Sequence, residues 1–442
     1  MKKYGILGIA RSGIAAAKKI KLFGHNVILS DNKPKSSFDL DLDENFEYEF
    51  DGHTNKLLEC DTIIVSPGIP LTIPIIQKAK ERNIELISEI EFGFRIKHPD
   101  SKIIAITGSN GKSTTVSLIY HILKTAGYNV VLGGNIGEAF TSFPIETPGL
   151  DYIVLELSSF QLELIDTFHA DVAAILNITP DHLNRYAGFD EYARTKFNIF
   201  NNQTEDDLMI LNKDDSTILK INTQKNPATF SMKDLADIYF DDENVICNNK
   251  TKFQPSDFSI KGPHNIANIM AALLAVSKCQ ISQDILKKAL RTFSPLPHRM
   301  EFAGSINGIE FYNDSKATNT DSVRYALQSF GKPITVIMGG AGKGEDYSVL
   351  NEVLRKYAKH IYLVGDSAEE MYKVFKNITK TEIFPNYESC ISDAVKNSQG
   401  GDIVVLSPAC TSYDNFINFE HRGDYFKQKV KELKNEIENL HN

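Results

Sequence analysis

The chain has 442 residues, too many for a single hydrophobic core, and at roughly 150 residues per domain we expect three domains. Apolar residues make up 42% and charged residues 24%, an ordinary globular composition that argues against long disordered tracts. With 48 basic and 57 acidic residues the formal net charge is −9, which offers no electrostatic footprint for DNA or RNA, so we expect no nucleic-acid partner.

Export, membrane insertion and disulfide formation are not indicated either. The longest uninterrupted apolar run, residues 269–276, is far shorter than the ~20 residues that span a bilayer. The five cysteines are scattered and never form a Cys-x-x-Cys pair, so neither a disulfide framework nor a zinc cluster is predicted. We expect a cytoplasmic protein without membrane contact and, because no hydrophobic interface pattern is evident, a monomer.

Three βα units recur along the chain. Each begins with an apolar β-branched stretch that a glycine turn joins to a helical pattern, and they lie at residues 4–23, 102–127 and 334–358. Proline-containing breaks, which disfavour helix, separate them. We therefore predict three α/β domains with mostly parallel sheets, at residues 1–97, 98–296 and 297–442.

The first part of the chain alternates short apolar strands with helical patterns, which predicts a parallel sheet with helices on its faces. The expected strands are residues 4–9, 27–30 and 62–65. The glycines at its start, Gly5, Gly8 and Gly13, do not form the Gly-x-Gly-x-x-Gly pattern, which argues against a nicotinamide dinucleotide as the ligand.

A phosphate-binding loop opens the second part. The strand at residues 103–106 runs into Thr-Gly-Ser-Asn-Gly-Lys-Ser-Thr and then into a helical pattern. Backbone N–H groups there can wrap a polyphosphate, while the helix N-terminus and Lys112 add positive charge and Ser113 offers a hydroxyl to Mg²⁺. The general pattern places its first glycine six residues before the lysine, where this chain has Ile106, so the loop is a variant. ATP is predicted to bind on Gly108, Ser109, Asn110, Gly111, Lys112, Ser113 and Thr114.

Two further polar residues follow predicted strands in this part. Glu156 ends the strand that begins at Tyr152, where a second Mg²⁺ ligand is expected beside such a loop, although a surface glutamate is the alternative. Asn135 lies in the turn Gly-Gly-Asn-Ile-Gly, which could bring the backbone close to a ligand or could simply turn.

A histidine and a lysine complete the candidates of the second part. His182 follows the buried-looking strand at residues 172–176 and could bind metal or transfer a proton, although a lone histidine is more often structural. Lys196 lies on a helical pattern with apolar neighbours, where a lysine would ordinarily extend to the surface. The lysine-rich tail at residues 427–434 is predicted to form the polar face of a closing helix.

Eight motifs in chain order resemble the Mur ligases of peptidoglycan synthesis. They are Thr-Gly-Ser-Asn-Gly-Lys-Ser-Thr, Gly-Gly-Asn-Ile-Gly, Leu-Glu-Leu-Ser-Ser-Phe-Gln-Leu-Glu, Asp-His-Leu-Asn-Arg-Tyr, Gly-Pro-His-Asn-Ile-Ala-Asn, Pro-His-Arg, Asn-Asp-Ser-Lys-Ala-Thr-Asn and Ser-Pro-Ala-Cys-Thr-Ser. The resemblance extends from Gly5 to Phe419. The third and seventh motifs resemble most the D-glutamate-adding members of the family.

The resemblance implies an ATP-dependent ligase of cytoplasmic peptidoglycan precursor synthesis. ATP would phosphorylate the terminal carboxylate of UDP-N-acetylmuramoyl-L-alanine, and the amine of D-glutamate would then displace phosphate and form an amide. An acyl phosphate splits one hard step into two easier ones. The charge on the transferring phosphoryl group needs cations, which Lys112 and two Mg²⁺ would supply.

The resemblance also assigns the metal ligands and catalytic residues. Ser113 and Glu156 would hold the Mg²⁺ on the nucleotide, while His182 and a carbamylated Lys196 would hold the second ion. Carbamylation needs the neutral amine, which burial among apolar neighbours favours. Lys112, Glu156, His182 and Lys196 are therefore the expected catalytic residues.

The remaining site residues follow from the same resemblance. A Rossmann-like N-terminal domain would bind the UDP substrate through Arg11, Ser12, Asp31, Asn32, Lys33, Ser66, Pro67 and Gly68, with Asn135 from the central domain. A Rossmann-like C-terminal domain would close over ATP, and the further ATP contacts would be Asn268, Arg299, Asp314 and Lys316. D-Glutamate would meet Thr318, Lys343, Ser412 and Phe419. Ala341 and Gly342 stand where relatives often carry an aspartate, which puts one ATP-side or hinge contact in doubt.

Two other functions compete with this interpretation. A folylpolyglutamate synthase shares the variant loop and the carbamylated lysine, but it lacks a uridine-type unit at its start. A nucleotide-dependent switch protein would explain the loop alone, but it needs no acyl-phosphate site and therefore no counterpart of His182 and Lys196.

Overall fold

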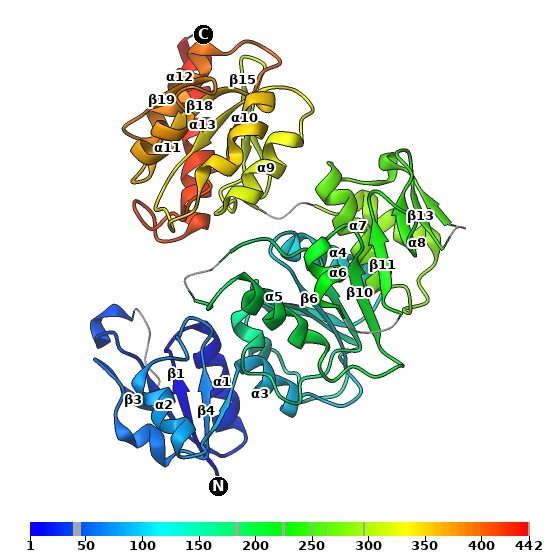
Figure 1. The fold of residues 1–442 in the computed structure, drawn as a ribbon, viewed down its shortest axis with the longest axis vertical. Coiled ribbons are helices and arrows are strands. Elements are labelled where there is room, and N and C mark those ends of the chain that lie inside the picture. The colour runs from blue at the N-terminus through cyan, green and yellow to red at the C-terminus, as the bar shows by residue number, and fades with distance from the viewer. Residues whose placement is uncertain are drawn as a thin grey trace. The chain divides into compact units, whose positions relative to one another are not determined.

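The computed structural model describes residues 1–38, 46–181, 185–222, 226–248, 251–260, 262–294 and 297–440. The chain forms two compact units, Met1–Ser259 with Ile266–Phe293 and Ile260–Asn265 with Ser294–Asn442. Figure 1 shows the α/β character of each unit, with helices on both faces of its sheets. No helix among the residues described is long and apolar enough to cross a membrane.

The first sheet is fully parallel and has the strand order β3-β2-β1-β4-β5. Its strands are β1 (Lys3–Leu7), β2 (Asn26–Ser30), β3 (Glu47–Glu49), β4 (Thr62–Val65) and β5 (Glu85–Ile87), and its helices are α1 (Arg11–Leu22), α2 (Pro74–Glu81) and α3 (Glu89–Ile96), with short η1 (Lys35–Ser37) and η2 (Asn55–Glu59). The chain order reverses beside β1, which lies between β2 and β4. In parallel sheets such a reversal opens a crevice at the carboxyl ends of the strands.

The second sheet has nine strands in the order β14-β13-β12-β11-β10-β9-β6-β8-β7, and β13 pairs antiparallel with both its neighbours while the other pairs are parallel. Its strands are β6 (Lys102–Thr107), β7 (Val130–Gly134), β8 (Tyr152–Glu156), β9 (Val172–Ile175), β10 (Leu208–Asn212), β11 (Ala228–Ser231), β12 (Ile238–Phe240), β13 (Val245–Cys247) and β14 (Thr251–Phe253). Its helices are α4 (Lys112–Thr125), α5 (Phe189–Phe197), α6 (Ser216–Ile221), α7 (Pro263–Ala275) and α8 (Gln283–Thr292), with η3 (Phe140–Ser142), η4 (Phe160–Leu162), η5 (Asn198–Phe200) and η6 (Pro255–Asp257). The central strands β6, β8 and β9 are almost entirely buried, as expected for apolar runs covered by helices on both faces.

The third sheet has the order β15-β16-β20-β17-β18-β19, and only β15 runs antiparallel to its neighbour. Its strands are β15 (Glu301–Ile306), β16 (Ile309–Asn313), β17 (Ile334–Met338), β18 (Ala358–Leu363), β19 (Lys380–Ile383) and β20 (Ile403–Leu406). Its helices are α9 (Thr320–Gln328), α10 (Asn351–Tyr357), α11 (Ala368–Phe375), α12 (Tyr387–Asn397) and α13 (Phe419–Leu440), with η7 (Tyr347–Leu350).

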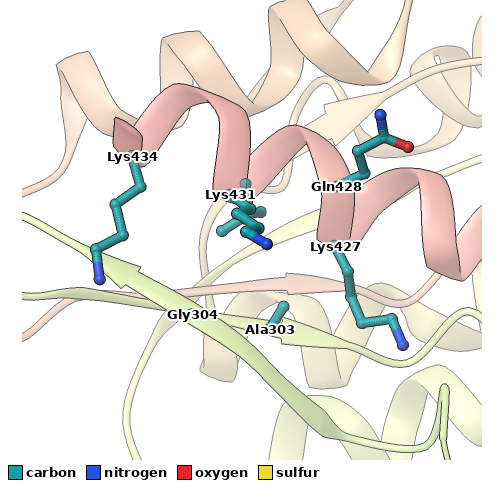
Figure 2. A pocket seen from close by; sticks show the side chains of 7 residues that line it. Ala303, Gly304, Lys427, Gln428, Lys431 and Lys434 are labelled. Carbon is teal, nitrogen blue, oxygen red and sulfur yellow. The ribbon is translucent and has the colours of Figure 1, made fainter. Parts of the chain in front are cut away.

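The edge strand β15 is protected against pairing with another chain. Its register shifts between Phe302 and Gly304, so a β-bulge twists the edge. Figure 2 shows Lys427, Lys431 and Lys434 leaving α13 beside this strand, where they line a shallow pocket. Bulges and lysines are common devices that keep exposed edges from adding strands. The predicted closing helix is therefore present, with its lysines along a polar flank.

The sheets correspond to the predicted α/β fold class. Strands β1 to β5 lie before residue 97, β6 to β14 between residues 102 and 253, and β15 to β20 after residue 300. The first two sheets belong to one compact unit. The boundaries at residues 97 and 296 themselves stay predictions.

Candidate active site

The predicted phosphate loop joins β6 to α4. Gly108 and Gly111 have φ values of 152° and 83°, which L side chains rarely adopt. A Cβ atom on Gly111 would also lie 2.3 Å from Oδ1 of Asn268, so this position has no room for a side chain and Asn268 lies against the loop. Because Gly111 at the N-cap has no side chain to accept bonds from the first turn of α4, that turn is suited to an external anion.

The segment after β9 fastens the loop. The N–H of Ser109 donates to the carbonyl oxygen of Asn177 (2.9 Å), the N–H of Asn110 donates to Oδ1 of Asn177 (2.8 Å), and Nδ2 of Asn177 donates to the carbonyl oxygen of Asn110 (3.0 Å). The N–H of Thr179 donates to Oγ of Ser109 (2.9 Å), which also lies 3.0 Å from the hydroxyl of Tyr192. The sequence analysis missed Asn177 and Tyr192 as parts of this site. The only signal was a polar residue directly after a buried strand.

Two lysines converge on the carbonyl groups of the loop. Nζ of Lys112 donates to the carbonyl oxygens of Gly108 and Ser109, both at 2.8 Å. Nζ of Lys196 donates to the carbonyl oxygen of Gly108 (3.0 Å) and lies 4.7 Å from the centroid of the Tyr192 ring. Lys196 is only 2% exposed, so it does not reach the surface as its sequence pattern alone suggested.

The environment of Lys196 favours its neutral amine. Burial, and then the charge of Lys112, hold the pKa of Lys196 well below its ordinary range, while Asp181 and Glu156 oppose the shift. A neutral, buried amine is the chemical form that reacts with CO₂, so this position fits the expected carbamylation.

Glu156 and Asn135 meet at the ends of β8 and β7. The N–H of Asn135 donates to the carbonyl oxygen of Glu156 (2.8 Å), and Nδ2 of Asn135 donates to its Oε1 (2.7 Å). Glu156 is 2% and Ser113 1% exposed. A carboxylate and a hydroxyl are oxygen donors of the kind that Mg²⁺ prefers, so these residues fit the expected ion.

The structure thus gathers the loop, Asn135, Glu156 and Lys196 around the carboxyl ends of neighbouring strands of the second sheet. His182 lies outside the described residues. Among the residues that are described, no three His, Cys, Asp or Glu side chains cluster as metal ligands. The two-ion site therefore stays a prediction.

The predicted UDP-binding residues of the first domain follow the carboxyl ends of β1, β2 and β4. Asp31 is buried, and its carboxylate accepts bonds from the N–H groups of Ile9 (2.9 Å) and Lys33 (3.1 Å). Oγ of Ser66 donates to the carbonyl oxygen of Gly8 (3.2 Å). Asp31 and Ser66 therefore shape the loops of the crevice. The other predicted residues on these loops and at the start of α1 are Arg11, Ser12, Asn32, Lys33, Pro67 and Gly68.

The predicted residues of the second unit follow β16, β17 and β20. They are Asp314, Lys316, Thr318, Lys343, Ser412 and Phe419. Burial raises the pKa of Asp314 to about 7, while the charge of Arg299 and a hydrogen bond from Ser407 oppose the rise. Nζ of Lys316 lies 5.2 Å from the centroid of the Phe419 ring, whereas Lys343 is exposed.

Comparison with known proteins identifies the family. Residues 2–88 match the Mur ligase MurD-like N-terminal domain, residues 106–276 the Mur ligase middle domain, and residues 298–410 the Mur ligase glutamate ligase domain. A curated relative from Cytophaga hutchinsonii, named UDP-N-acetylmuramoylalanine--D-glutamate ligase, is 40% identical over 98% of this chain and 99% of its own. A relative of the same name from Salinibacter ruber is 36% identical over 97% of each chain. The chain belongs to the Mur ligase family.

Solved structures agree with the fold of this Mur ligase. A UDP-N-acetylmuramate-alanine ligase from Thermotoga maritima has a TM-score of 0.64 at 18% identity, covering 98% of this chain and 100% of its own. A pseudomurein peptide ligase type C from Methanothermus fervidus has a TM-score of 0.63 at 20% identity with the same coverage. At these identities the likeness concerns the fold alone. The predicted fold class and the family resemblance are confirmed.

A buried arginine that the sequence analysis missed organises the C-terminal loops of this Mur ligase. Arg422 is fully buried, and its guanidinium donates to Oγ and the carbonyl oxygen of Ser315 and to the carbonyl oxygens of Cys410 and Thr411, at 2.8 to 3.0 Å. Oγ of Ser315 in turn donates to the carbonyl oxygen of Phe419 (2.8 Å). Arg422 thereby joins the loops after β16 and β20 to the start of α13.

Two side chains lie close to Gly342 in this Mur ligase. A Cβ atom there would lie 2.7 Å from Oγ of Ser367 and 2.9 Å from the hydroxyl of Tyr347. The neighbouring Ala341 pairs with Thr411 through two backbone bonds of 3.0 Å. A longer side chain at residue 342 would have to displace Ser367 and Tyr347.

Proposed function

We propose that this Mur ligase joins D-glutamate to UDP-N-acetylmuramoyl-L-alanine in an ATP-dependent reaction of peptidoglycan precursor synthesis. Relatives that carry the name of this reaction are 36–40% identical over nearly the whole chain. The structural observation that carries the proposal is a buried lysine whose amine bonds to the phosphate loop itself. A nucleotide switch needs no such group, and a ligase that activates a carboxylate does.

The reaction would proceed through an acyl phosphate. A carboxylate oxygen of the substrate attacks the γ-phosphorus of ATP, and the bond to the β-phosphate oxygen breaks and releases ADP. The amine of D-glutamate then attacks the carbonyl carbon, loses a proton and expels phosphate. Splitting amide formation in this way replaces a poor leaving group by a good one.

The chain's own residues would bind and orient the phosphates. The N–H groups of the first turn of α4 would donate to phosphate oxygens, while those of Ser109 and Asn110 stay bonded to Asn177. Lys112 would exchange its bonds to Gly108 and Ser109 for bonds to the nucleotide. Ser113 and Glu156 would hold a Mg²⁺ ion, which would supply positive charge to offset the charge of the phosphates. Asn135 fixes the orientation of the Glu156 carboxylate through its bond to Oε1.

We assign a second Mg²⁺ to His182 and to a Lys196 carbamate. In its neutral form the buried amine of Lys196 would react with CO₂ and lose a proton. The side chain would then end in a carboxylate-like group, so that a cation becomes an anionic ligand. Tyr192 covers this side chain with its ring and bonds Ser109 with its hydroxyl. We further propose that the enzyme works in the cytoplasm as a monomer, without nucleic-acid or membrane partners.

The substrate ends are assigned to the crevices at the strand ends. The first sheet would bind the UDP group at Arg11, Ser12 and the loops after β2 and β4, and the second unit would bind D-glutamate through Thr318, Lys343, Ser412 and Phe419. Asn268, Arg299, Asp314 and Lys316 would complete the ATP contacts. An uncapped helix start suits a diphosphate, and lysine and hydroxyl groups suit carboxylates.

Phosphate release tests the proposal. The purified protein is given ATP, Mg²⁺ and UDP-N-acetylmuramoyl-L-alanine, with D-glutamate, with L-glutamate or with no amino acid. Release that requires D-glutamate supports the proposal. Release that is indifferent to the amino acid points to a nucleotide-binding switch, and release that requires a folate with L-glutamate points to a folylpolyglutamate synthase.

A further inference from the structure

Two buried carboxylates in the first turn of α3 differ in how well they are satisfied. Glu91 is fully buried, and its oxygens accept bonds from Arg95 and from the N–H groups of Thr167 and Phe168. Glu89 is 2% exposed, and its Oε1 accepts bonds from the N–H (2.6 Å) and hydroxyl (2.7 Å) of Thr141. Its Oε2 has no hydrogen-bond partner within the described part of the chain. A buried polar atom without a partner costs free energy, so Glu89 needs an explanation that Glu91 does not.

Glu89 holds a segment of the second sheet's connections against the helices of the first sheet. Thr141 lies in η3, which packs against both α1 and α3. A Cβ atom on Gly93 of α3 would lie 2.5 Å from the Phe140 ring, so the two elements are in close contact. Lys19 of α1 forms a second tie, a largely buried ion pair with Glu146 at 2.6 Å.

The same segment begins at the proposed active site. Asn135, directly after β7, is bonded to the backbone and side chain of Glu156. The segment from Asn135 to Glu146 is thus anchored in three places: on Glu156, on Glu89 and on Lys19. Glu89 lies in the middle of this chain of contacts, between the predicted nucleotide crevice and the carboxylate predicted to bind Mg²⁺.

The charges around Glu89 connect it to the nucleotide crevice. Arg11, at the start of α1, is the charged residue whose field acts on Glu89. On the same two helices, Lys19 of α1 is paired with Glu146, and Glu91 of α3 is paired with Arg95. The η3 turn contributes Phe140, Thr141 and Ser142, none of which is charged. Burial raises the pKa of Glu89 to about 7, while the bonds from Thr141 and the charge of Arg11 oppose the rise.

We propose that Glu89 is a positioning residue for the nucleotide-sugar substrate, which holds the segment beginning at Asn135 and takes up a proton when the substrate's diphosphate binds near Arg11. The inference rests on the proposed function, because Arg11 and Asn135 are proposed substrate contacts. Without substrate, the charge of Arg11 favours the ionised form of Glu89. A diphosphate at the start of α1 draws on the charge of Arg11 and brings negative charge close, so the ionised form of Glu89 becomes less favourable. Glu89 then takes a proton from solvent.

Calorimetry on the wild-type protein counts this proton. Binding of UDP-N-acetylmuramoyl-L-alanine is measured at pH 7 in two buffers with different heats of ionisation. A group half ionised at pH 7 takes up at most about 0.5 proton when its pKa rises. We expect an uptake approaching that value in the wild type and none in Glu89→Gln. Equal uptake in both proteins overturns the proton role of Glu89.

Kinetics of matched variants separate positioning from general stability. Glu89→Gln keeps the acceptor for Thr141 but removes the negative charge on which Arg11 acts. We therefore expect a several-fold higher KM for the nucleotide sugar, with the KM for ATP nearly unchanged. Glu89→Ala, which also loses the acceptor, should have a larger effect. Glu91→Gln is the control, because Glu91 lies two residues further along α3 and is also buried. It should leave the proton count and the KM of the nucleotide sugar unchanged. Equal shifts in both KM values would show that Glu89 is only structural. A wild-type protein without D-glutamate-dependent turnover would contradict the proposed function itself, whereas normal turnover with unchanged Glu89→Gln parameters contradicts only this inference.

Discussion

The side-chain bonds between Asn177 and the phosphate loop can be removed by one substitution, Asn177→Ala. The change deletes two side-chain hydrogen bonds, of 2.8 and 3.0 Å, to the N–H and carbonyl of Asn110. The backbone bond from Ser109 to the Asn177 carbonyl remains. The loop should therefore keep its path but lose the contacts that fix the orientation of its central peptide groups.

The expected size of the effect follows from these two bonds. A net contribution of about 1 kcal/mol per bond gives a loss of about 2 kcal/mol in the free energy of unfolding. Binding ATP would have to restore the same order in the loop. Because 1.4 kcal/mol corresponds to a tenfold change, we expect the Kd for ATP to rise by roughly 10- to 30-fold.

Asn212→Ala is the matched control. Nδ2 of Asn212 donates to the carbonyl oxygen of Leu176 (2.9 Å), and its Oδ1 accepts from the N–H of Asp214 (2.9 Å). Asn212→Ala therefore loses the same two kinds of bond as Asn177→Ala, but at the end of β10, which does not carry the phosphate loop. Urea unfolding should show similar losses in both variants, while calorimetry with ATP should show the weaker binding only in Asn177→Ala. Equal ATP affinity in the two variants would refute the reasoning that Asn177 orders the loop for nucleotide.

Three further predictions concern other parts of the molecule. Lys196→Ala should abolish turnover, and added bicarbonate should not restore it; near wild-type activity would remove Lys196 from the site. Arg422→Lys keeps the charge but loses the planar fork of donors, so thermal unfolding should show a loss of about 3 kcal/mol, against almost none for the more exposed Arg324→Lys. The folded-state pKa of Asp314 lies at about 7, above the ordinary 3.8, so the folded protein binds more protons between these values and is destabilised as pH rises through that window. Relative to Asp314→Asn, the free energy of unfolding of the wild type should fall by about 3 kcal/mol from pH 4 to pH 7, and parallel pH profiles would contradict the burial argument.

The sequence predicted those features whose signal is local. The apolar runs of β6, β8 and β9, the glycines of the phosphate loop and the helix after it all lie within short windows, so periodicity and turn chemistry were enough. The positions of Glu156 and Asn135 at strand ends followed from the same patterns, and the structure places them in direct contact.

Residues whose partners are distant in sequence could not be found in this way. Asn177 contacts a loop 67 residues before it, Arg422 contacts a loop 107 residues before it, and Glu89 contacts Thr141 52 residues after it. An asparagine after a strand or an arginine near a helix start has no local pattern that distinguishes it from a surface residue. Lys196 shows the same limit, because its helical pattern suggested exposure and only the family resemblance suggested a buried functional role.

Transfer of labelled oxygen tests the proposed ligase chemistry most directly. UDP-N-acetylmuramoyl-L-alanine labelled with ¹⁸O in its terminal carboxylate is incubated with the enzyme, ATP, Mg²⁺ and D-glutamate, and the phosphate released is analysed by mass spectrometry. If the carboxylate oxygen attacks the γ-phosphorus and leaves with it, one labelled oxygen appears in each phosphate formed together with the amide. Unlabelled phosphate would mean that water had attacked ATP, and this would contradict the acyl-phosphate ligase.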